Sequence, residues 1–261
     1  MDPNAEKFAA LQFSAEGRQP IEQAVAREIL LTIFLNGKEL VTLLCSPKDM
    51  KYLVAGFLVS EGLLNNKEQI KKIEVDEWEG IVRVETDSNI ETDSRFFSKR
   101  LITSGCGAGA AFYSLADVAI AKVESKMQIS PAEVIALVKE FQLRSELYLS
   151  THGVHSAAFC ERQNILIFNE DIGRHNAIDK IFGRCLLEDI PTAGRAIISS
   201  GRVSSEIMHK VARRGIPIVI SISAPTSLGV KVAENYGITL IASARGKKFD
   251  VYTNDWRVIS D

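Results

Sequence analysis

A chain of 261 residues suits one large domain or two smaller ones, and 46% hydrophobic with 25% charged residues is typical of a soluble globular protein. Its 31 basic and 33 acidic residues give a net charge of -2, which excludes a global field for nucleic acid or an anionic membrane. Residues 1–26 lack the pattern of a targeting peptide and no stretch resembles a membrane span, so we expect a cytoplasmic protein.

The first part of the chain predicts a small α+β domain, residues 27–125, behind a flexible arm, residues 1–26. The arm is expected to be loosely ordered because it mixes charged and small residues without sustained periodicity. The elements predicted for the domain are strands at 28–35 and 38–45 joined by Asn36-Gly37, a helix opened by Ser46-Pro47 and ending near Gly62, strands at 70–75 and 80–86, and a helix at 110–122.

The second part, residues 126–261, predicts an α/β domain. It opens with a helix at 130–144 whose start, Ser130-Pro131-Ala132-Glu133, is a capping box. Strands and helices then alternate, which indicates helices covering a largely parallel or mixed sheet. The expected strands are 154–160, 164–168, 195–199, 217–221, 238–242 and 249–252, and the expected helices are 174–187, 204–213 and 227–236.

Four cysteines are widely spaced, and we expect free thiols without a disulfide framework or a cysteine-rich zinc site. Cys106 differs from the other three because it lies among three glycines in the segment 103–110. Such a loop can present a reactive thiol to another molecule, or it can be a turn whose cysteine is a small buried hydrophobe. Cys45, Cys160 and Cys185 lie in predicted strands or on an apolar helix face and are expected to be packing residues.

Three segments end a strand and begin a helix with small or polar residues: 170–176, 199–205 and 223–227. Ligands of open α/β sheets bind at the carboxyl ends of the strands, where backbone N–H groups and helix N-termini favour phosphate. Arg174 and Arg202 could add charge-assisted hydrogen bonds. Any one segment could instead hold capping serines and solvated arginines, but three in one domain favour an anion site.

The histidines do not predict a metal site. His152 and His155 are three residues apart in a strand-like segment, so their side chains point to different faces. His175 lies at the predicted ligand cleft, where it could act as a general base or donate a hydrogen bond to the ligand. His209 falls within a helix beside basic residues and is expected to be exposed to solvent.

Five segments together match a family pattern that extends from about Arg27 to Tyr252. They are Thr103-Ser104-Gly105-Cys106-Gly107, Gly153-Val154-His155-Ser156-Ala157-Ala158, Glu170-Asp171-Ile172-Gly173-Arg174-His175-Asn176-Ala177-Ile178-Asp179-Lys180, Ser200-Gly201-Arg202-Val203-Ser204-Ser205-Glu206 and Ser223-Ala224-Pro225-Thr226-Ser227-Leu228. In these motifs the chain resembles the formate dehydrogenase accessory sulfurtransferases, the FdhD family.

The resemblance implies a sulfur carrier that accepts sulfur from a cysteine desulfurase as a persulfide on Cys106. The sulfur would pass to the molybdenum of the bis-molybdopterin guanine dinucleotide cofactor, which is then inserted into apo-formate dehydrogenase. It also implies a homodimer and a cytidine-deaminase-like fold, a three-layer α/β domain with a mixed sheet, for residues 126–261. The alternative is a non-catalytic chaperone that holds the cofactor for formate dehydrogenase.

One departure concerns the cysteine loop. Many relatives carry C-x-x-C there, whereas Gly109 occupies the place of the second cysteine in this chain. Cys106 would then act alone, because a persulfide needs only one nucleophilic thiolate. A relay of sulfur between two loop cysteines is therefore in doubt.

The same matching places the family's cofactor-binding segment on Ser243-Ala244-Arg245-Gly246-Lys247-Lys248. Cations around a glycine after a strand suit a pyrophosphate or guanine nucleotide such as GDP, a partial mimic of the cofactor, although a basic turn is the commoner explanation for such a segment alone. A zinc nucleoside deaminase is excluded because the chain contains neither H-x-E nor P-C-x-x-C. The remaining candidates for cofactor binding are Arg174, His175, Gly201, Arg202 and Ser223.

Overall fold

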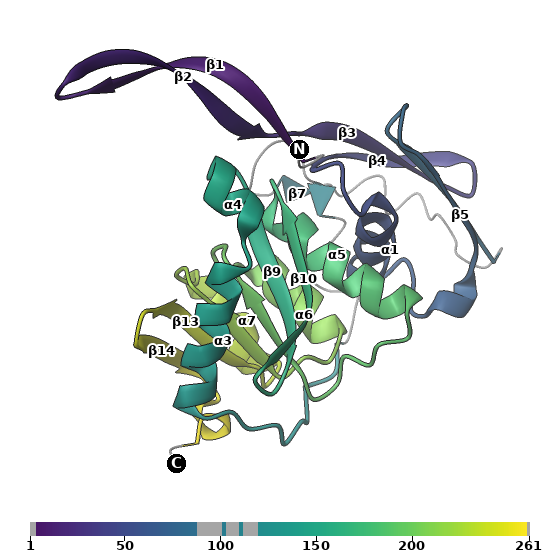
Figure 1. Cartoon of the computed structure of the whole chain (residues 1–261). Coiled ribbons are helices and arrows are strands. Elements are labelled where there is room, and N and C mark those ends of the chain that lie inside the picture. The colour runs from purple at the N-terminus through teal and green to yellow at the C-terminus, as the bar shows by residue number, and fades with distance from the viewer. Residues whose placement is uncertain (1–3, 88–100, 103–109, 112–119, 260–261) are drawn as a thin grey trace.

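The computed structural model describes residues 4–87, 101–102, 110–111 and 120–259 (Figure 1). Within these ranges the strands form an exposed hairpin, a four-stranded sheet, a pair of very short strands and a six-stranded sheet. Cys106 and the predicted loop residues 103–109 lie outside the described residues. The division of the chain at residues 125 and 126 stays a prediction.

The segment predicted to be a loosely ordered arm is a regular β-hairpin instead. β1 (Ala5–Ser14) and β2 (Gly17–Ala26) pair antiparallel over their full length, and no side chain of either strand is buried. Figure 1 shows the hairpin projecting from the rest of the chain. Because neither face rests on a core, the sequence lacks the alternation of apolar and polar residues by which a strand is recognised.

The four-stranded sheet has the order β4-β3-β6-β5, and its strands were all predicted. They are β3 (Ile29–Leu35), β4 (Lys38–Cys45), β5 (Ile70–Asp76) and β6 (Ile81–Thr86), with the short 3-10 helix η1 (Lys67–Gln69) before β5. Asn36 and Gly37 have φ of 50° and 77°, and this left-handed backbone is what a tight hairpin between β3 and β4 requires.

Helix α1 (Met50–Ser60) begins later than the sequence predicts. Ser46 was expected to be its N-cap, but its hydroxyl accepts a hydrogen bond from the backbone N–H of Ile172 at 3.1 Å. The Ser46 backbone N–H donates to the Asp171 carboxylate, also at 3.1 Å. The serine therefore connects the end of β4 to the second half of the chain rather than starting a helix.

The six-stranded sheet has the order β10-β9-β11-β12-β13-β14 and is mixed. β11, β12 and β13 are mutually parallel, and β9 and β14 run against their neighbours, so β10 points the same way as the parallel three. The strands are β9 (His155–Glu161), β10 (Asn164–Asp171), β11 (Ala196–Ser199), β12 (Ile218–Ser221), β13 (Thr239–Arg245) and β14 (Lys248–Thr253).

Helices cover both faces of this sheet. Alternate residues of β11 and β12 belong to two separate cores, since Ile197 and Val219 face one and Ile198 and Ile220 the other. The first core lies under α5 (Arg174–Leu187), α6 (Ser205–Arg213) and α7 (Ser227–Asn235), and the second under α3 (Pro131–Leu143). The described chain is thus a mixed α/β protein with a three-layer second half, and its likeness to cytidine deaminases stays a prediction.

The helix predicted at 110–122 is not found where residues are described. Ala110–Ala111 is the strand β8, which pairs antiparallel with β7 (Leu101–Ile102), and residues 120–122 have no helical structure. The backbone after them is held by other partners, since Val123 N–H donates to Tyr236 O at 2.8 Å and Val123 O accepts from Arg257 at 3.2 Å. Residues 112–119 lie outside the described ranges. Arg257 belongs to the 3-10 helix η2 (Asp255–Arg257).

Helices α1 and α5 cross at two glycines with their backbones in contact. A Cβ added to Gly56 would lie 1.7 Å from Asp179 O, and one added to Gly183 would lie 1.8 Å from Tyr52 O. Neither distance is possible for real atoms, so only glycine fits at the crossing. This contact joins the four-stranded sheet, through α1, to the layer that covers the six-stranded sheet (Figure 1).

Two buried ion pairs involve neighbouring residues of α5, Asp179 and Lys180. Lys180 Nζ is 2.7 Å from the Asp171 carboxylate, and both side chains are fully buried. Lys210 Nζ is 2.5 Å from Asp179, whose other oxygen accepts from Ser60 Oγ at 2.7 Å. Buried charges are costly unless paired, so removing one partner leaves the other charge unpaired in the interior. The first pair therefore ties α5 to β10, and the second, together with Ser60, fixes how α1, α5 and α6 meet.

Substitution at the helix crossing tests this account of the fold. We expect Gly183→Ala to lower the free energy of unfolding by about 3 kcal/mol or more, because the added methyl overlaps a backbone carbonyl. Gly194→Ala is the control: its φ is +69° but nothing lies within 4 Å, so only the backbone cost of about 1–2 kcal/mol applies. Urea unfolding measures the free energy of unfolding of both variants. Equal losses of stability would contradict a backbone contact at the crossing of α1 and α5.

Candidate functional site

The carboxyl ends of β10, β11, β12 and β13 lie at one edge of the six-stranded sheet, because these strands share a direction. The three segments singled out in the sequence, 170–176, 199–205 and 223–227, follow β10, β11 and β12 at this edge. The basic segment 243–248 spans the end of β13 and the start of β14. The structure therefore gathers the described candidate residues at the end of the sheet where these strands finish, which we call the strand edge.

Hydrogen bonds link the loops along this edge. Ser200 Oγ accepts from Ser156 N–H at 2.9 Å and lies 3.2 Å from His155 Nδ1. The hydroxyl of Ser221 donates to Gly201 O at 2.9 Å, and Ser243 N–H donates to Ser223 O at 3.0 Å. The edge is thus a continuous, hydrogen-bonded surface from β9 to β13.

Arg174 and Gly201 come from different loops and are in contact. A Cβ at Gly201 would lie 2.7 Å from Arg174 Cβ, so this glycine leaves the room that the arginine occupies. Arg174 is the first residue of α5, and Gly201 lies four residues before α6. Arg202, the next residue, is exposed.

The first turns of α5 and α6 are not capped by side chains. Gly173, the N-cap of α5, has none, and Ser204, the N-cap of α6, makes no side-chain cap hydrogen bond. Ser204 Oγ is buried and has no hydrogen-bond partner among the described residues. In contrast, Thr226 caps α7 by accepting from Gly229 N–H at 3.1 Å. Uncapped helix N-termini beside Arg174 are suited to an anion.

His175 is held neutral. Burial is the largest cause that lowers its pKa to about 3, and the nearby cations Lys210 and Arg174 lower it further. Its Nε2 lies 3.4 Å from the Glu206 carboxylate, whose own pKa is raised by burial. A base with so low a pKa is a poor proton acceptor at neutral pH, so His175 is suited to hydrogen bonding rather than general-base chemistry.

His155 faces the same edge. Burial and Arg174 lower its pKa, and Asp171 opposes them. The structure thus brings His155 and Ser200 together, which the sequence interpretation did not. Both residues lie in motifs that the sequence analysis singled out. The contact between the two side chains depends on the pairing of β9 with β11, which those motifs do not reveal.

The basic segment forms the exposed turn between β13 and β14. Arg245, Gly246, Lys247 and Lys248 are all exposed, and Ala244 is buried. Arg245 Nε donates to Ile222 O at 2.8 Å, which ties the turn to the end of β12. Because β11 and β13 are separated by one strand, the turn lies two strand spacings, about 10 Å, along the sheet from the end of β11, which carries Gly201. An extended ligand is needed to contact both.

The three described cysteines are buried packing residues, as predicted. Burial is the main cause that raises the pKa of each thiol, Cys45, Cys160 and Cys185, to about 12. A thiol with this pKa is almost entirely protonated at neutral pH, and only the thiolate is nucleophilic. None of the three can serve as a reactive cysteine in this fold.

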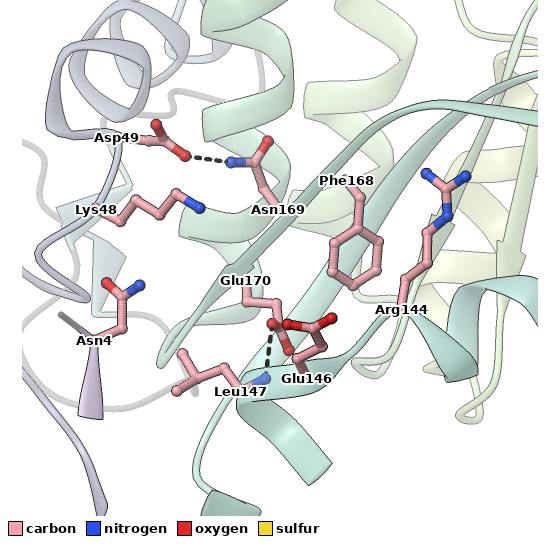
Figure 2. A pocket seen from close by; sticks show the side chains of 9 residues that line it. All are labelled: Asn4, Lys48, Asp49, Arg144, Glu146, Leu147, Phe168, Asn169 and Glu170. Atoms are coloured by element: carbon pink, nitrogen blue, oxygen red, sulfur yellow. Dashed lines mark hydrogen bonds between the residues drawn. The ribbon is translucent and has the colours of Figure 1, made fainter. Parts of the chain in front are cut away.

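A separate pocket of about 180 Å³ lies where β1, the start of α1, the joint of α3 with α4 (Glu146–Thr151) and β10 meet (Figure 2). The Asp49 carboxylate accepts from Asn169 Nδ2 at 2.9 Å, and the Glu170 carboxylate accepts from Leu147 N–H at 3.2 Å. Of its lining residues only Glu170 belongs to a segment singled out in the sequence, and none is among the predicted cofactor-binding residues. The lining residues are Asn4, Lys48, Asp49, Arg144, Glu146, Leu147, Phe168, Asn169 and Glu170.

The chemistry of this pocket differs from that of the strand edge. Its lining has three carboxylates against two cations, and Figure 2 shows Lys48 reaching into the space beside them. Such a lining disfavours a pyrophosphate. The pocket is therefore not the predicted nucleotide site.

His209 was expected to be solvent-exposed, and this is wrong. It is partly buried, its Nδ1 lies 3.3 Å from Tyr236 Oη, and the two rings meet edge to face. Burial lowers its pKa. Among the described residues no three of the histidines, cysteines and acidic residues are grouped to hold a metal, and no helix is long and apolar enough to cross a membrane.

The fold and the strand edge define a mixed α/β protein whose polar loops meet at the carboxyl ends of its strands. Comparison with known proteins identifies its family. The FdhD/NarQ family model matches residues 26–259, and the chain belongs to this family.

The relatives are similar along the whole chain. It is 42% identical to the sulfur carrier protein FdhD of Bacillus pumilus over 260 residues, 99% of each chain. It is 43% identical to that of Bacillus subtilis over 239 residues, 91% of each. A crystal structure described as a formate dehydrogenase accessory protein of Desulfotalea psychrophila has a TM-score of 0.80 and 27% identity, covering 98% of this chain and 100% of that one.

The low pKa of His175 makes a prediction for stability. Between the unfolded pKa of about 6.5 and the folded pKa of about 3, the unfolded state binds more protons, so stability falls as the pH falls through this window. The His175 contribution has a slope of up to about 1.4 kcal/mol per pH unit. Urea unfolding of wild type and His175→Gln at pH 6.5 and 4.5 should show the variant losing about 2 kcal/mol less. Parallel losses would contradict the burial of a neutral His175.

Proposed function

We propose that this chain is a sulfur carrier that accepts a sulfur atom on Cys106 as a persulfide and delivers it to the molybdenum cofactor for formate dehydrogenase. The observation that carries the proposal is the burial of the other three thiols, Cys45, Cys160 and Cys185, which leaves Cys106 as the remaining candidate nucleophile. The relatives' name, sulfur carrier protein FdhD, supports the same activity.

The first transfer is a thiol–disulfide type of exchange. The Cys106 thiolate attacks the terminal sulfur of a persulfide on a cysteine desulfurase, a new S–S bond forms on Cys106, and the desulfurase cysteine leaves as a thiolate. In the second transfer the terminal sulfur passes to molybdenum as sulfide. Reduced molybdenum, Mo(IV), supplies the two electrons, and Cys106 leaves as a thiolate.

The strand edge is the proposed site for the guanine dinucleotide part of the cofactor. The uncapped N-termini of α5 and α6, with Arg174 and Arg202, would hold one phosphate group. The exposed cations of the turn 245–248, about two strand spacings away, would hold another part of this extended ligand. The cofactor is cargo in this scheme, and the full set proposed to contact it is Ser243, Ala244, Arg245, Gly246, Lys247, Lys248, Gly201, Arg202, Arg174, His175 and Ser223.

The second candidate function is a non-catalytic chaperone that binds the same cofactor and docks to apo-formate dehydrogenase. Gly109 favours it, because the second cysteine of the C-x-x-C pattern is missing. Both functions require nucleotide binding at the strand edge. They differ only in whether Cys106 carries sulfur.

Intact mass separates the two functions. After incubation with a cysteine desulfurase and cysteine, the wild-type chain should gain one sulfur atom, about 32 Da, and Cys106→Ala should gain none. Cys160→Ala is the matched control and should gain the same mass, because its thiol is buried. No gain on the wild type, with GDP still bound, would support the chaperone.

Calorimetry with GDP tests the strand-edge site. Arg174→Ala and Lys248→Ala should each weaken binding about tenfold, since each removes one charge-assisted contact. Lys139→Ala is the control, because Lys139 is exposed on α3, over the opposite face of the sheet from α5 and α6. If all three variants bind GDP as wild type does, the site is elsewhere.

A further inference from the structure

A tryptophan is almost fully exposed in the turn between β5 and β6. The exposed fraction of Trp78 is 99%, although tryptophan usually buries most of its large ring. The turn is well defined, since the Asp76 carboxylate accepts hydrogen bonds from the backbone N–H groups of Trp78 at 3.1 Å and Glu79 at 3.0 Å. The backbone of Trp78 is therefore fixed before any partner binds, which reduces the entropic cost of docking.

The same turn packs against the neighbouring strand β3. The backbone N–H of Thr32 donates to Gly80 O at 2.8 Å. A Cβ added to Gly80 would lie 2.3 Å from Leu30 O, and the φ of Gly80 is +64°, so only glycine allows this close approach. The turn that carries Trp78 therefore lies beside Leu30, near the start of β3.

Leu30 and Leu44 extend the exposed apolar surface from this turn. They are paired across β3 and β4, so both side chains point to the same face of the sheet, and their exposed fractions are 64% and 40%. Leu31 and Ile33 alternate with them along β3 and point to the opposite face, into the core that includes α1. We call Leu30, Leu44 and Trp78 the Trp78 patch.

Carboxylates border the Trp78 patch. Glu77 and Glu79 flank Trp78 in the turn, Glu28 lies two residues before Leu30, and all three glutamates are exposed. None of these glutamates forms an ion pair with another described residue. An apolar surface with an acidic border complements a basic protein segment that carries an apolar side chain, and it repels nucleic acid and anionic membranes.

The patch adjoins the strand edge. Leu44 O accepts a hydrogen bond from Asn176 Nδ2 at 2.8 Å, and Asn176 lies two residues after Arg174 in α5. A protein bound to the patch would therefore lie next to the polar loops. None of the three patch residues belongs to the set proposed to contact the cofactor, so docking and ligand binding can be measured separately.

We propose that the Trp78 patch is a docking surface for a basic segment of a second protein. The apolar side chain of that segment packs on Trp78, and its lysines or arginines face Glu77 and Glu79. Tryptophan is enriched among the residues that dominate the binding free energy of protein interfaces, and charges at the border speed association and select the partner. This surface goes beyond the proposed function, because it involves neither Cys106 nor a nucleotide.

Calorimetry with a synthetic peptide and the full chain tests the proposal. The probe is a 12-residue peptide in which six lysines surround a central leucine and phenylalanine, in 50 mM salt. The wild type should bind it with a dissociation constant below 100 µM, and Trp78→Ala should weaken binding at least about tenfold, because it removes the apolar contact. Trp256→Phe is the matched control: it changes the other tryptophan, in η2, and binding should be unaltered.

The acidic border is tested with a second pair of variants. Glu77→Gln with Glu79→Gln should weaken binding of the peptide about tenfold in 50 mM salt and less in 500 mM salt, where charges are screened. Glu39→Gln with Glu85→Gln is the matched control, because both glutamates are exposed at the opposite end of the same sheet. This control should bind as the wild type does, and a probe with glutamates in place of its lysines should not bind.

Fluorescence shows where the peptide binds. In Trp256→Phe all tryptophan emission comes from Trp78, since the chain has two tryptophans, and the emission should shift to shorter wavelength as the peptide covers the ring. The docking surface is overturned if the bound peptide leaves this emission unchanged, if Trp78→Ala binds as tightly as wild type, or if 1 mM peptide does not bind. A shift that appears without peptide, as the concentration of the chain itself is raised, would instead assign the patch to a second copy.

Discussion

The contact between α1 and α5 is the constraint on which the rest of the described structure depends. Two glycines, Gly56 and Gly183, allow the helix backbones to touch, and a buried ion-pair network links Glu61 at the end of α1, through Lys210 of α6, to Asp179 of α5. A hydrophobic contact alone would tolerate sliding and repacking. Paired buried charges do not tolerate such sliding, because a shift of one helical turn leaves a charge without its counterion in a low-dielectric interior. The crossing is therefore unique in register as well as in position.

This register reaches the strand edge through Asp171. Its carboxylate is bound by Lys180, by the N–H of Ser46 at the end of β4, and by the N–H of Gly173 just before Arg174. The turn that carries Arg174 and His175 is thus built partly by residues from the first half of the chain. The same low-dielectric surroundings that strengthen these bonds also keep His175 uncharged. Binding at this edge would rest on fixed dipoles and arginines rather than on a titrating histidine.

A feature could be predicted from the sequence where a short motif determines it. Asn36-Gly37 and the capping box at Ser130 carry their information within four residues, and both are confirmed. The gathering of the polar loops followed from the strand-end rule. Ser46 was misassigned because its hydroxyl is used by Ile172, 126 residues away, and no local pattern reveals such a partner. The arm was missed because a strand exposed on both faces has no hydrophobic period. The contact of Arg174 with Gly201 and the burial of His175 likewise depend on tertiary packing.

The crossing of α1 with α5 also has a consequence for the order in which the chain folds. Gly183 is synthesised 127 residues after Gly56, an interval of roughly 6–25 s at the usual rates of translation. During that time the apolar residues of α1 have no α5 to pack against, so part of their surface stays exposed to water. Docking of α1 is a late, non-local step. Because the same step places Ser46 on Asp171, the strand edge reaches its final geometry only when the two halves of the chain have met.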